Sequence, residues 1–152
     1  MLKIETTVLV VVDVQGKLAQ LMHDRAALFN ALQRVIGGAR SLALPILWAE
    51  QNPDRMGPTI PEIRSLLPDL QPIPKLSFSC AGEPRFLAAL QQTGRRQVLL
   101  AGIETHVCMA QTAADLVAGG YEVEVPADAV SSRTAENRAV GLEKIRAILR
   151  GD

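Results

Sequence analysis

A nearly uninterrupted run of aliphatic and β-branched residues, Thr-Val-Leu-Val-Val-Val at 7–12, restricts the fold of this chain more than any other feature. The run lacks the alternation of polar and apolar residues that marks a strand with one wet face. Both faces of the strand must therefore be buried. Such strands lie at the centre of parallel sheets that carry helices on both sides, so the run favours an α/β fold.

The remaining sequence alternates short β-rich runs with amphipathic stretches. Strands are expected at 46–49, near 72–75, at 97–103 and at 121–125, and helices at 24–44, 84–93, 107–118 and from Thr134 onward. This alternation predicts one domain, residues 1–152, built on a doubly wound parallel sheet. The stretch 51–61 contains three prolines and a glycine, and its length predicts a functional loop.

Composition and charge exclude several classes of partner. Lys plus Arg and Asp plus Glu number 16 each, so no overall charge favours nucleic acid or an anionic membrane surface. No apolar run approaches the roughly 20 residues that span a bilayer. Residues 1–7 show no separate apolar segment of a signal peptide, and the two cysteines form no disulfide framework. We expect a cytoplasmic protein with reduced thiols.

Three chemically reactive residues follow three of the expected strands. Asp13 comes directly after the first strand, Lys75 ends the segment near 72–75, and Cys108 follows the strand at 97–103. The carboxyl ends of parallel strands share one edge of the sheet, where α/β proteins bind their ligands. We therefore expect a carboxylate, an ammonium and a thiol to converge there, with the pKa of the desolvated Asp13 raised.

Cys108 is also expected in the first turn of a helix. The helix dipole and the free backbone N–H groups at that place predict a lowered thiol pKa and a binding site for an oxyanion. Each residue has an ordinary alternative: Asp13 as a turn or cap residue, Lys75 as a surface lysine, and Cys108 as a small core residue. Their convergence, which depends on the predicted sheet, favours catalysis.

Five segments together resemble the isochorismatase-like cysteine hydrolase superfamily, most closely its isochorismatase-domain hydrolases with Glu-Gln-Asn-Pro after the second strand. The segments are Val-Val-Val-Asp-Val-Gln around Asp13, Trp-Ala-Glu-Gln-Asn-Pro at 48–53, Pro-Lys-Leu-Ser-Phe-Ser-Cys at 74–80, Gly-Ile-Glu-Thr-His-Val-Cys at 102–108 and Ala-Asp-Ala-Val-Ser-Ser-Arg at 127–133. The resemblance implies a three-layer α/β/α fold whose mostly parallel sheet has five or six strands in the order 3-2-1-4-5.

The same resemblance implies a mechanism. Asp13, Lys75 and Cys108 are the implied catalytic triad. The peptide bond between Ile103 and Glu104 is implied to be cis, and the backbone N–H groups of Glu104 and Cys108 are implied to form an oxyanion hole. Members of the superfamily hydrolyse small amides through a covalent acyl-enzyme. Relatives commonly assemble, which predicts a homo-oligomer, either a dimer or a tetramer.

The chain departs from the better-known branches of the superfamily. Nicotinamidases bind a metal through an Asp and His cluster after the second strand, whereas this chain has only His23 and His106. We expect no catalytic metal, and no cofactor because no Gly-rich phosphate motif follows a strand. True isochorismatases lack the cysteine, so Cys108 argues against vinyl-ether cleavage. The superfamily usually continues past the last helix, so we expect the sheet edge beyond 121–125 to be bare or covered by a partner subunit.

Gln15, Gln51 and Phe78 are the candidates for lining the substrate pocket, and further lining residues are expected from the loop at 51–61. Gln15 follows the first strand, Gln51 begins the loop at 51–61, and Phe78 lies three residues after Lys75. The partner expected in this pocket is a small molecule, with neither nucleic acid nor membrane involved.

Three further residues have ordinary interpretations. Cys80 is expected in a loop or in the core. His106 precedes the thiol by two positions and is expected to be structural or to lie at the pocket rim. Arg133 either contacts an acidic group of the substrate or forms a salt bridge with Asp128 or Glu104, and the salt bridge is the more ordinary expectation.

Together these features predict a metal-independent hydrolase of a small amide or related C–N bond, with Cys108 as nucleophile, Asp13 as general acid and base, and Lys75 as the electrostatic activator. Two alternatives belong to other classes. The chain is a catalytically idle binding or assembly protein on the same scaffold, or it is a thiol-based redox protein in which Cys80 resolves Cys108.

Overall fold

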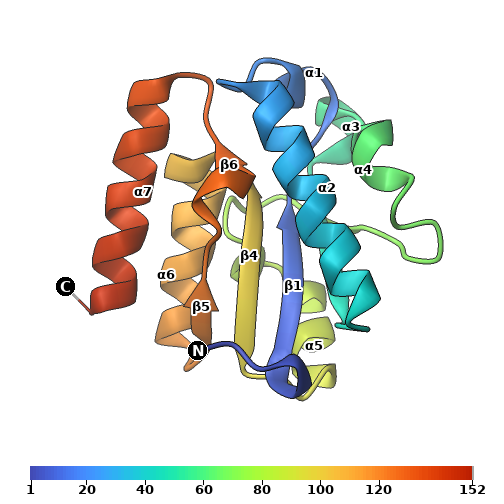
Figure 1. Cartoon of the computed structure of the whole chain (residues 1–152), viewed down its shortest axis with the longest axis vertical. Helices are drawn as coiled ribbons and strands as arrows, with labels where there is room; N and C mark the ends of the chain where they lie inside the picture. Colours follow the sequence, from blue (N-terminus) through green and yellow to red (C-terminus); the bar gives the residue numbers. More distant parts are fainter. Residues whose placement is uncertain (152) are drawn as a thin grey trace.

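The computed structural model describes residues 1–151 and contains a parallel sheet with the strand order β3-β2-β1-β4-β5, as predicted. A further strand, β6, pairs with β4 alongside β5. The strands are β1 (Thr7–Val12), β2 (Ile46–Gln51), β3 (Ile73–Lys75), β4 (Gln97–Ile103), β5 (Glu122–Glu124) and β6 (Val130–Ser131). Figure 1 shows β1 and β4 side by side near the middle of the molecule.

The central position of β1 follows from its sequence. All six of its residues are buried. β1 pairs in parallel with β2, where Leu9 lies opposite Ile46, and with β4, where Thr7 lies opposite Gln97. Alternate side chains of β1 point to opposite faces of the sheet, so Val8 and Leu9 belong to two different apolar clusters. A run without polar interruptions is therefore explained by helices on both faces.

The helices form the two outer layers. On one face lie α1 (Gly16–Gln20), α2 (Arg25–Ser41), α3 (Pro53–Met56) and α4 (Pro61–Arg64); on the other lie α5 (Pro84–Gln92), α6 (Ala110–Ala118) and α7 (Ala135–Arg150). In Figure 1, α2 crosses in front of β1, and α5 and α6 lie behind the sheet. No helix within residues 1–151 is both long and apolar enough to cross a membrane.

Short helical turns complete the fold. Three are 3₁₀ turns: η1 (Ile4–Thr6), η2 (Cys80–Gly82) and η4 (Ala127–Ala129). The fourth, η3 (Thr105–Met109), is a π-helical turn that leads directly into α6. The helix expected at 107–118 thus begins two residues earlier and with a wider turn than regular periodicity predicts. Single π turns are frequent at functional sites.

Two expectations, one about the stretch 51–61 and one about the buried face of the last helix, were wrong. The stretch 51–61, expected as a loop, holds all of α3 and the start of α4, and each of these helices begins with a proline. Proline suits the first helical position because the N–H it lacks has no helical partner there. In α7, Ile145 is buried as expected, but Ala139 and Leu149 are exposed, so the buried face is narrower than the sequence predicts.

The outer edge of β4 is shared by two short strands. β5 pairs with its first half, where Gln97 lies opposite Glu122, and β6 with its second half, where Gly102 lies opposite Val130. No strand was predicted at β6, which has only two residues and is too short to show a periodic pattern. On β5, the exposed charges of Glu122 and Glu124 alternate with a buried valine, and charges on an edge strand discourage pairing with a further strand.

Candidate active site

Asp13 stands at the carboxyl end of β1 and is almost completely buried, with 2% of its surface exposed. One carboxylate oxygen, Oδ2, accepts a hydrogen bond of 2.8 Å from Nζ of Lys75. The other, Oδ1, is buried and accepts no hydrogen bond from the described residues. Burial raises the pKa of Asp13 above its ordinary value, although Lys75 acts in the opposite direction. The expected desolvation of this carboxylate is thus present, and one of its oxygens is free to take a proton.

Lys75 ends β3 and its side chain is only 1% exposed, which rules out the surface-lysine interpretation. Besides Asp13, its Nζ donates to Oε1 of Gln51 at 2.7 Å and to the backbone oxygens of Ser77 and Phe78 at 3.0 and 2.9 Å. An ammonium has three protons, so these four acceptors account for all of them. Lys75 is therefore suited to hold a fixed positive charge in place.

Cys108 lies in the π-helical turn η3, with Sγ 3.9 Å from Nζ of Lys75. Residues from three strand ends thus converge as expected. The expected lowering of the thiol pKa was wrong. Burial raises the pKa of Cys108, the Asp13 carboxylate raises it further, and Lys75 opposes both. Desolvation and a nearby negative charge outweigh the helix terminus, so the resting group is a thiol.

Glu104 directly follows β4, and the peptide bond between Ile103 and Glu104 is cis. The carboxylate of Glu104 accepts hydrogen bonds from Nε and the backbone N–H of Arg133, at 3.2 and 3.1 Å. This is one of the two salt bridges considered for Arg133. The backbone oxygen of Glu104 accepts hydrogen bonds from the N–H groups of Val107 and Met109, which fastens the start of η3 to the end of β4.

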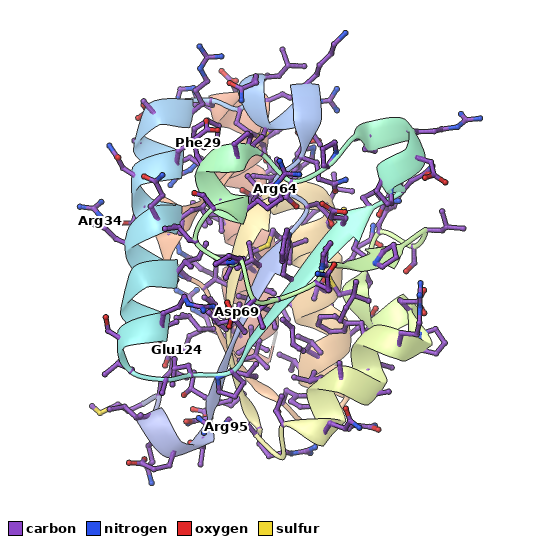
Figure 2. All side chains as sticks on the ribbon, turned by 90° about the vertical axis from the view of Figure 1, so that its right-hand side faces the viewer. Phe29, Arg34, Arg64, Asp69, Arg95 and Glu124 are labelled. Atoms are coloured by element: carbon purple, nitrogen blue, oxygen red, sulfur yellow. The ribbon has the colours of Figure 1, made fainter. Side chains whose placement is uncertain are left out.

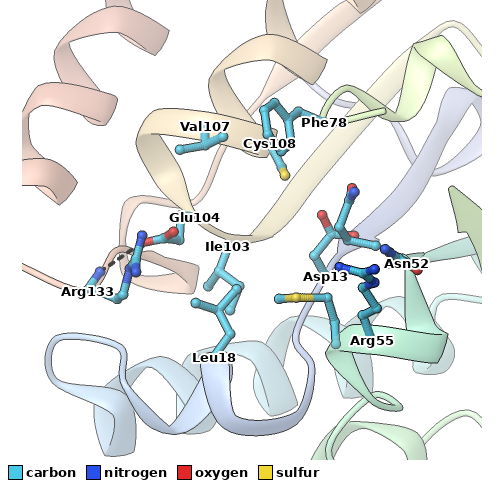
Figure 3. Close-up of a pocket in the computed structure, with 12 residues that line it drawn as sticks. Asp13, Leu18, Asn52, Arg55, Phe78, Ile103, Glu104, Val107, Cys108 and Arg133 are labelled. Atoms are coloured by element: carbon cyan, nitrogen blue, oxygen red, sulfur yellow. Dashed lines mark hydrogen bonds and ion pairs between the residues drawn. The ribbon is translucent and has the colours of Figure 1, made fainter. Parts of the chain in front are cut away.

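A pocket of about 320 Å³ opens at this end of the sheet (Figure 3). Its walls are largely apolar, with a few polar groups, as is usual in small-molecule sites. In Figure 3 the sulfur of Cys108 points toward the side of the pocket where Asp13 lies. The lining residues are Asp13, Leu18, Gln51, Asn52, Arg55, Met56, Phe78, Ile103, Glu104, Val107, Cys108 and Arg133.

Two of the three pocket candidates line this pocket, namely Gln51 and Phe78, and Gln15 does not. Gln15 is fully buried behind it. Its Nε2 donates to the backbone oxygens of Gln51 and Gly57 at 3.0 and 2.8 Å, and its Oε1 accepts from the N–H of Gln51 at 2.6 Å. With both ends of its amide occupied by backbone, Gln15 clamps the segment 51–57 and has no polar atom left for a substrate.

The remaining candidates have structural partners. Nδ1 of His106 lies 2.9 Å from Oγ of Ser132, which agrees with a structural role. Cys80 is fully buried, and burial raises the pKa of its thiol to about 12. Both cysteines are free thiols. Within residues 1–151, no group of three or more His, Cys, Asp or Glu side chains is arranged to hold a metal ion.

Asn52, Arg55 and Met56 also line the pocket; the stretch 51–61 was expected to contribute lining residues, but these three were not named individually. All three lie in or next to α3, the short helix inside the stretch that was expected to be a loop. The sequence signal was the Asn52-Pro53 pair. In the structure Asn52 adopts a left-handed conformation with φ 36° and Pro53 begins α3. An Asn-Pro pair marks a turn into a new helix, which determines the direction of the side chains that follow.

Known proteins resemble this chain along almost its whole length. The family model described as the isochorismatase domain matches residues 7–150. A secreted isochorismatase effector from Phytophthora sojae is 37% identical over 145 residues, which cover 93% of this chain and 69% of that protein. Isochorismatase domain-containing protein 1 from Danio rerio is 38% identical over 141 residues, 92% of this chain and 49% of that protein. The chain thus spans about half the length of the second relative.

Solved structures show the same fold. A structure described as the MAR1 ribonuclease from Caenorhabditis elegans is 32% identical, with a TM-score of 0.88 over 97% of this chain and 76% of that one. A gene product from Escherichia coli, described as an octameric hydrolase of unknown specificity, has a TM-score of 0.90 at 24% identity, over 97% of this chain and 74% of that one. At this identity the second likeness concerns the fold alone.

Proposed function

Because this chain belongs to the isochorismatase domain family, we propose that it is a cysteine hydrolase that cleaves a small amide or related C–N bond. One observation carries the proposal. Nζ of Lys75 lies 2.8 Å from Oδ2 of Asp13 and 3.9 Å from Sγ of Cys108, at the wall of a pocket sized for a small molecule. A buried acid, a fixed cation and a thiol at these distances form a nucleophile with its base and its activator.

In the acylation half, Sγ of Cys108 attacks the carbonyl carbon of the bound amide. Its proton passes to Oδ1 of Asp13, which accepts no hydrogen bond from the described residues, and the electron pair of the carbonyl moves to oxygen. When this tetrahedral intermediate collapses, the C–N bond breaks and Asp13 returns the proton to the departing nitrogen. The products are ammonia or an amine and a thioester at Cys108.

In the deacylation half, water attacks the thioester while Asp13 accepts one of its protons. Collapse of the second intermediate expels the sulfur, which takes the proton back from Asp13, and the carboxylic acid leaves. Lys75 remains charged throughout and stabilises the negative charge that moves between Asp13 and Sγ. We assign the oxyanion to the backbone N–H groups of Glu104 and Cys108, both of which belong to residues of the pocket wall.

The pKa directions support a concerted proton transfer. Burial raises the pKa of both Asp13 and Cys108, so a free thiolate is disfavoured in the empty pocket. A raised pKa also makes the Asp13 carboxylate a better proton acceptor at the moment of attack. The same buried acid is then a competent donor to the leaving nitrogen.

A nuclease function is not favoured, although one similar structure is described as a ribonuclease. The chain carries 16 basic and 16 acidic residues, and two arginines are the only basic side chains among those that line the pocket. Polynucleotide binding needs a basic surface that contacts several phosphates. A pocket of about 320 Å³ fits a small molecule instead.

Assembly and location remain proposals. We propose a homo-oligomer, a dimer or a tetramer; the Escherichia coli protein with the same fold is described as octameric, which is a precedent for assembly of this fold but not for either size. The predicted cytoplasmic location is kept as a proposal for this chain, while the Phytophthora sojae relative is described as secreted.

The proposed function is tested by offering the protein a panel of small amides. Turnover is followed by ammonia or amine release, and the intact protein is weighed by mass spectrometry after rapid acid quenching. We expect an adduct with the mass of the acyl group at Cys108, absent in Cys108→Ala. A catalytically idle scaffold gives neither turnover nor adduct with any member of the panel. Turnover that survives Cys108→Ala contradicts the mechanism.

The redox alternative has its own test. Mild peroxide treatment followed by mass mapping reports whether Cys80 and Cys108 become linked. Full burial of Cys80 and its raised thiol pKa disfavour attack by Cys80 on an oxidised partner. A disulfide between the two cysteines that forms faster than overoxidation of Cys108 would favour the redox protein over the hydrolase.

A further inference from the structure

The four charged residues that line the pocket are Asp13, Arg55, Glu104 and Arg133, and Lys75, buried behind the wall beside Asp13, brings their sum to one positive charge. Asp13 is paired with Lys75, and Glu104 is paired with Arg133. Arg55 completes the set of charged lining residues. Within residues 1–151 its guanidinium forms neither an ion pair nor a hydrogen bond, and the neighbouring Asp54 lies outside the pocket wall. One positive charge at the pocket is therefore left without a counterion.

The position of Arg55 is fixed by the fold. Arg55 stands on α3, between the two backbone oxygens that the buried amide of Gln15 holds. The N–H of Gly16 also donates to the backbone oxygen of Pro58 at 3.1 Å, just past α3. A Cβ at Gly16 would collide with the backbone oxygen of Met56. α3 is thus pressed against the start of α1, and Figure 3 shows Arg55 extending from it toward the side of the pocket that holds Asp13 and Asn52.

We propose that Arg55 binds an anionic group of the substrate, and that the preferred substrates are small amides carrying a carboxylate. This inference rests on the proposed function. A guanidinium presents a planar fork of donors that matches a carboxylate, and it stays charged at any working pH. Because the Arg55 side chain is exposed to solvent, water and salt weaken the contact. We expect a preference of about two- to tenfold for the anionic member of a matched pair.

Alkylation of Cys108 tests this without a known substrate. Iodoacetate and iodoacetamide differ chiefly in that the first carries a carboxylate where the second carries a neutral amide. The rate of each reaction at Cys108 is followed by peptide mass mapping, which also reports any reaction at Cys80. Arg55→Gln is expected to slow iodoacetate by about two- to tenfold and to leave iodoacetamide unchanged. A general effect of the substitution on the reactivity of the thiol changes both rates equally, so it does not change the ratio of the iodoacetate rate to the iodoacetamide rate.

Arg34→Gln is the matched control, because it removes the same charge from an exposed arginine on α2 that lies outside the pocket. Figure 2 shows Arg34 pointing away from the body of the protein. The control is expected to leave the rate ratio unchanged. High salt is expected to reduce the ratio in the native protein and to have less effect in Arg55→Gln. A ratio that is the same in the native protein and in Arg55→Gln overturns the proposal.

A second measurement separates this proposal from the proposed function. Cys108→Ser protein is titrated with succinamate and with its neutral analogue butanamide, and the NMR signal of the Arg55 side-chain Nε–H is followed. We expect a saturable shift with succinamate alone. No shift with either compound overturns the anion site even if the protein turns over neutral amides. A shift with succinamate in Cys108→Ser, together with no adduct at Cys108 when the native protein is offered the amide panel, supports the anion site and contradicts the hydrolase.

Discussion

Gly141 of α7 lies directly against Thr105, the first residue of the π-helical turn that carries Cys108. A Cβ placed on Gly141 would fall 2.7 Å from Cγ2 of Thr105 and 2.6 Å from its carbonyl carbon. Both distances are too short for a non-bonded contact of a Cβ atom. The carbonyl carbon belongs to the backbone, so it cannot move away by a side-chain rotation. The last helix of the chain therefore fixes the depth at which η3 lies, and with it the position of the thiol.

Gly141→Ala is expected to displace η3, because α7 and the turn cannot both keep their places. The free energy of unfolding should fall by about 1–3 kcal/mol, the usual cost of an overpacked contact. The rate of Cys108 alkylation should change as well, which a purely global loss of stability does not predict. Urea unfolding and alkylation kinetics on the same sample measure the two effects.

Gly37→Ala is the control for that change. Gly37 lies inside α2 with nothing within 4 Å of a Cβ, so alanine there should leave the alkylation rate unchanged and stabilise the protein by up to about 1 kcal/mol. If Gly141→Ala behaves like Gly37→Ala in both measurements, α7 does not position the nucleophile.

Lys75→Met should destabilise the protein strongly, because it leaves the buried Asp13 carboxylate without its cation. Breaking one partner of a buried pair typically costs about 3–5 kcal/mol. Lys75 lowers the pKa of Asp13 in the native protein, so its loss raises that pKa further above 3.8. The difference in stability between the two proteins should therefore be small at low pH and grow as pH rises through the window between their two Asp13 pKa values.

Urea unfolding at several pH values between 4 and 8 tests whether the stability difference grows with pH as predicted. Arg34→Gln, which removes a positive charge from the surface, should show no such growth with pH. If the difference in unfolding free energy between Lys75→Met and the native protein is the same at every pH in that range, the loss of Lys75 does not act through the charge of Asp13.

Much of this site follows from the sequence, because a residue that directly follows a buried strand has its position determined by the sheet. The ends of β1, β3 and β4 bring Asp13, Lys75 and Cys108 together. What sequence periodicity does not contain is the direction of a side chain in irregular backbone. Gln15 illustrates this limit: its amide turns back to the backbone at 51 and 57 instead of facing the pocket.

The pKa of the Cys108 thiol is a second property that the sequence does not predict, because it depends on burial in three dimensions. A cysteine at the start of a helix favours ionisation through the dipole, and that much is visible in the sequence. The extent to which the surrounding core desolvates Cys108, and the nearness of the Asp13 charge, are not visible there. In the structure these two effects prevail and raise the pKa.

Asp13→Asn separates the roles of the carboxylate. Asparagine has nearly the same shape but cannot accept the thiol proton, so turnover should fall by about 10²- to 10⁴-fold, the usual contribution of a general base. Because the Asp13 charge raises the pKa of Cys108, its removal should lower that pKa. The variant should thus be alkylated faster than the native protein near neutral pH while it is nearly inactive. Slower alkylation in Asp13→Asn would instead mean that Asp13 activates the thiol as a base more than its charge opposes ionisation of the thiol.

The alkylation rate of Cys108 should keep rising with pH beyond the point where an ordinary thiol is ionised. A free cysteine has a pKa of about 8.5, so its reaction with iodoacetamide levels off soon above that pH. Burial and the Asp13 carboxylate raise the pKa of Cys108 well above that value, so its rate should still be increasing at pH 10. A small-molecule thiol in the same buffers is the reference, and circular dichroism at each pH checks that the fold persists. A plateau below pH 8 would show a stabilised thiolate in the empty pocket, and the proton transfer to Asp13 would then precede substrate binding instead of accompanying the attack.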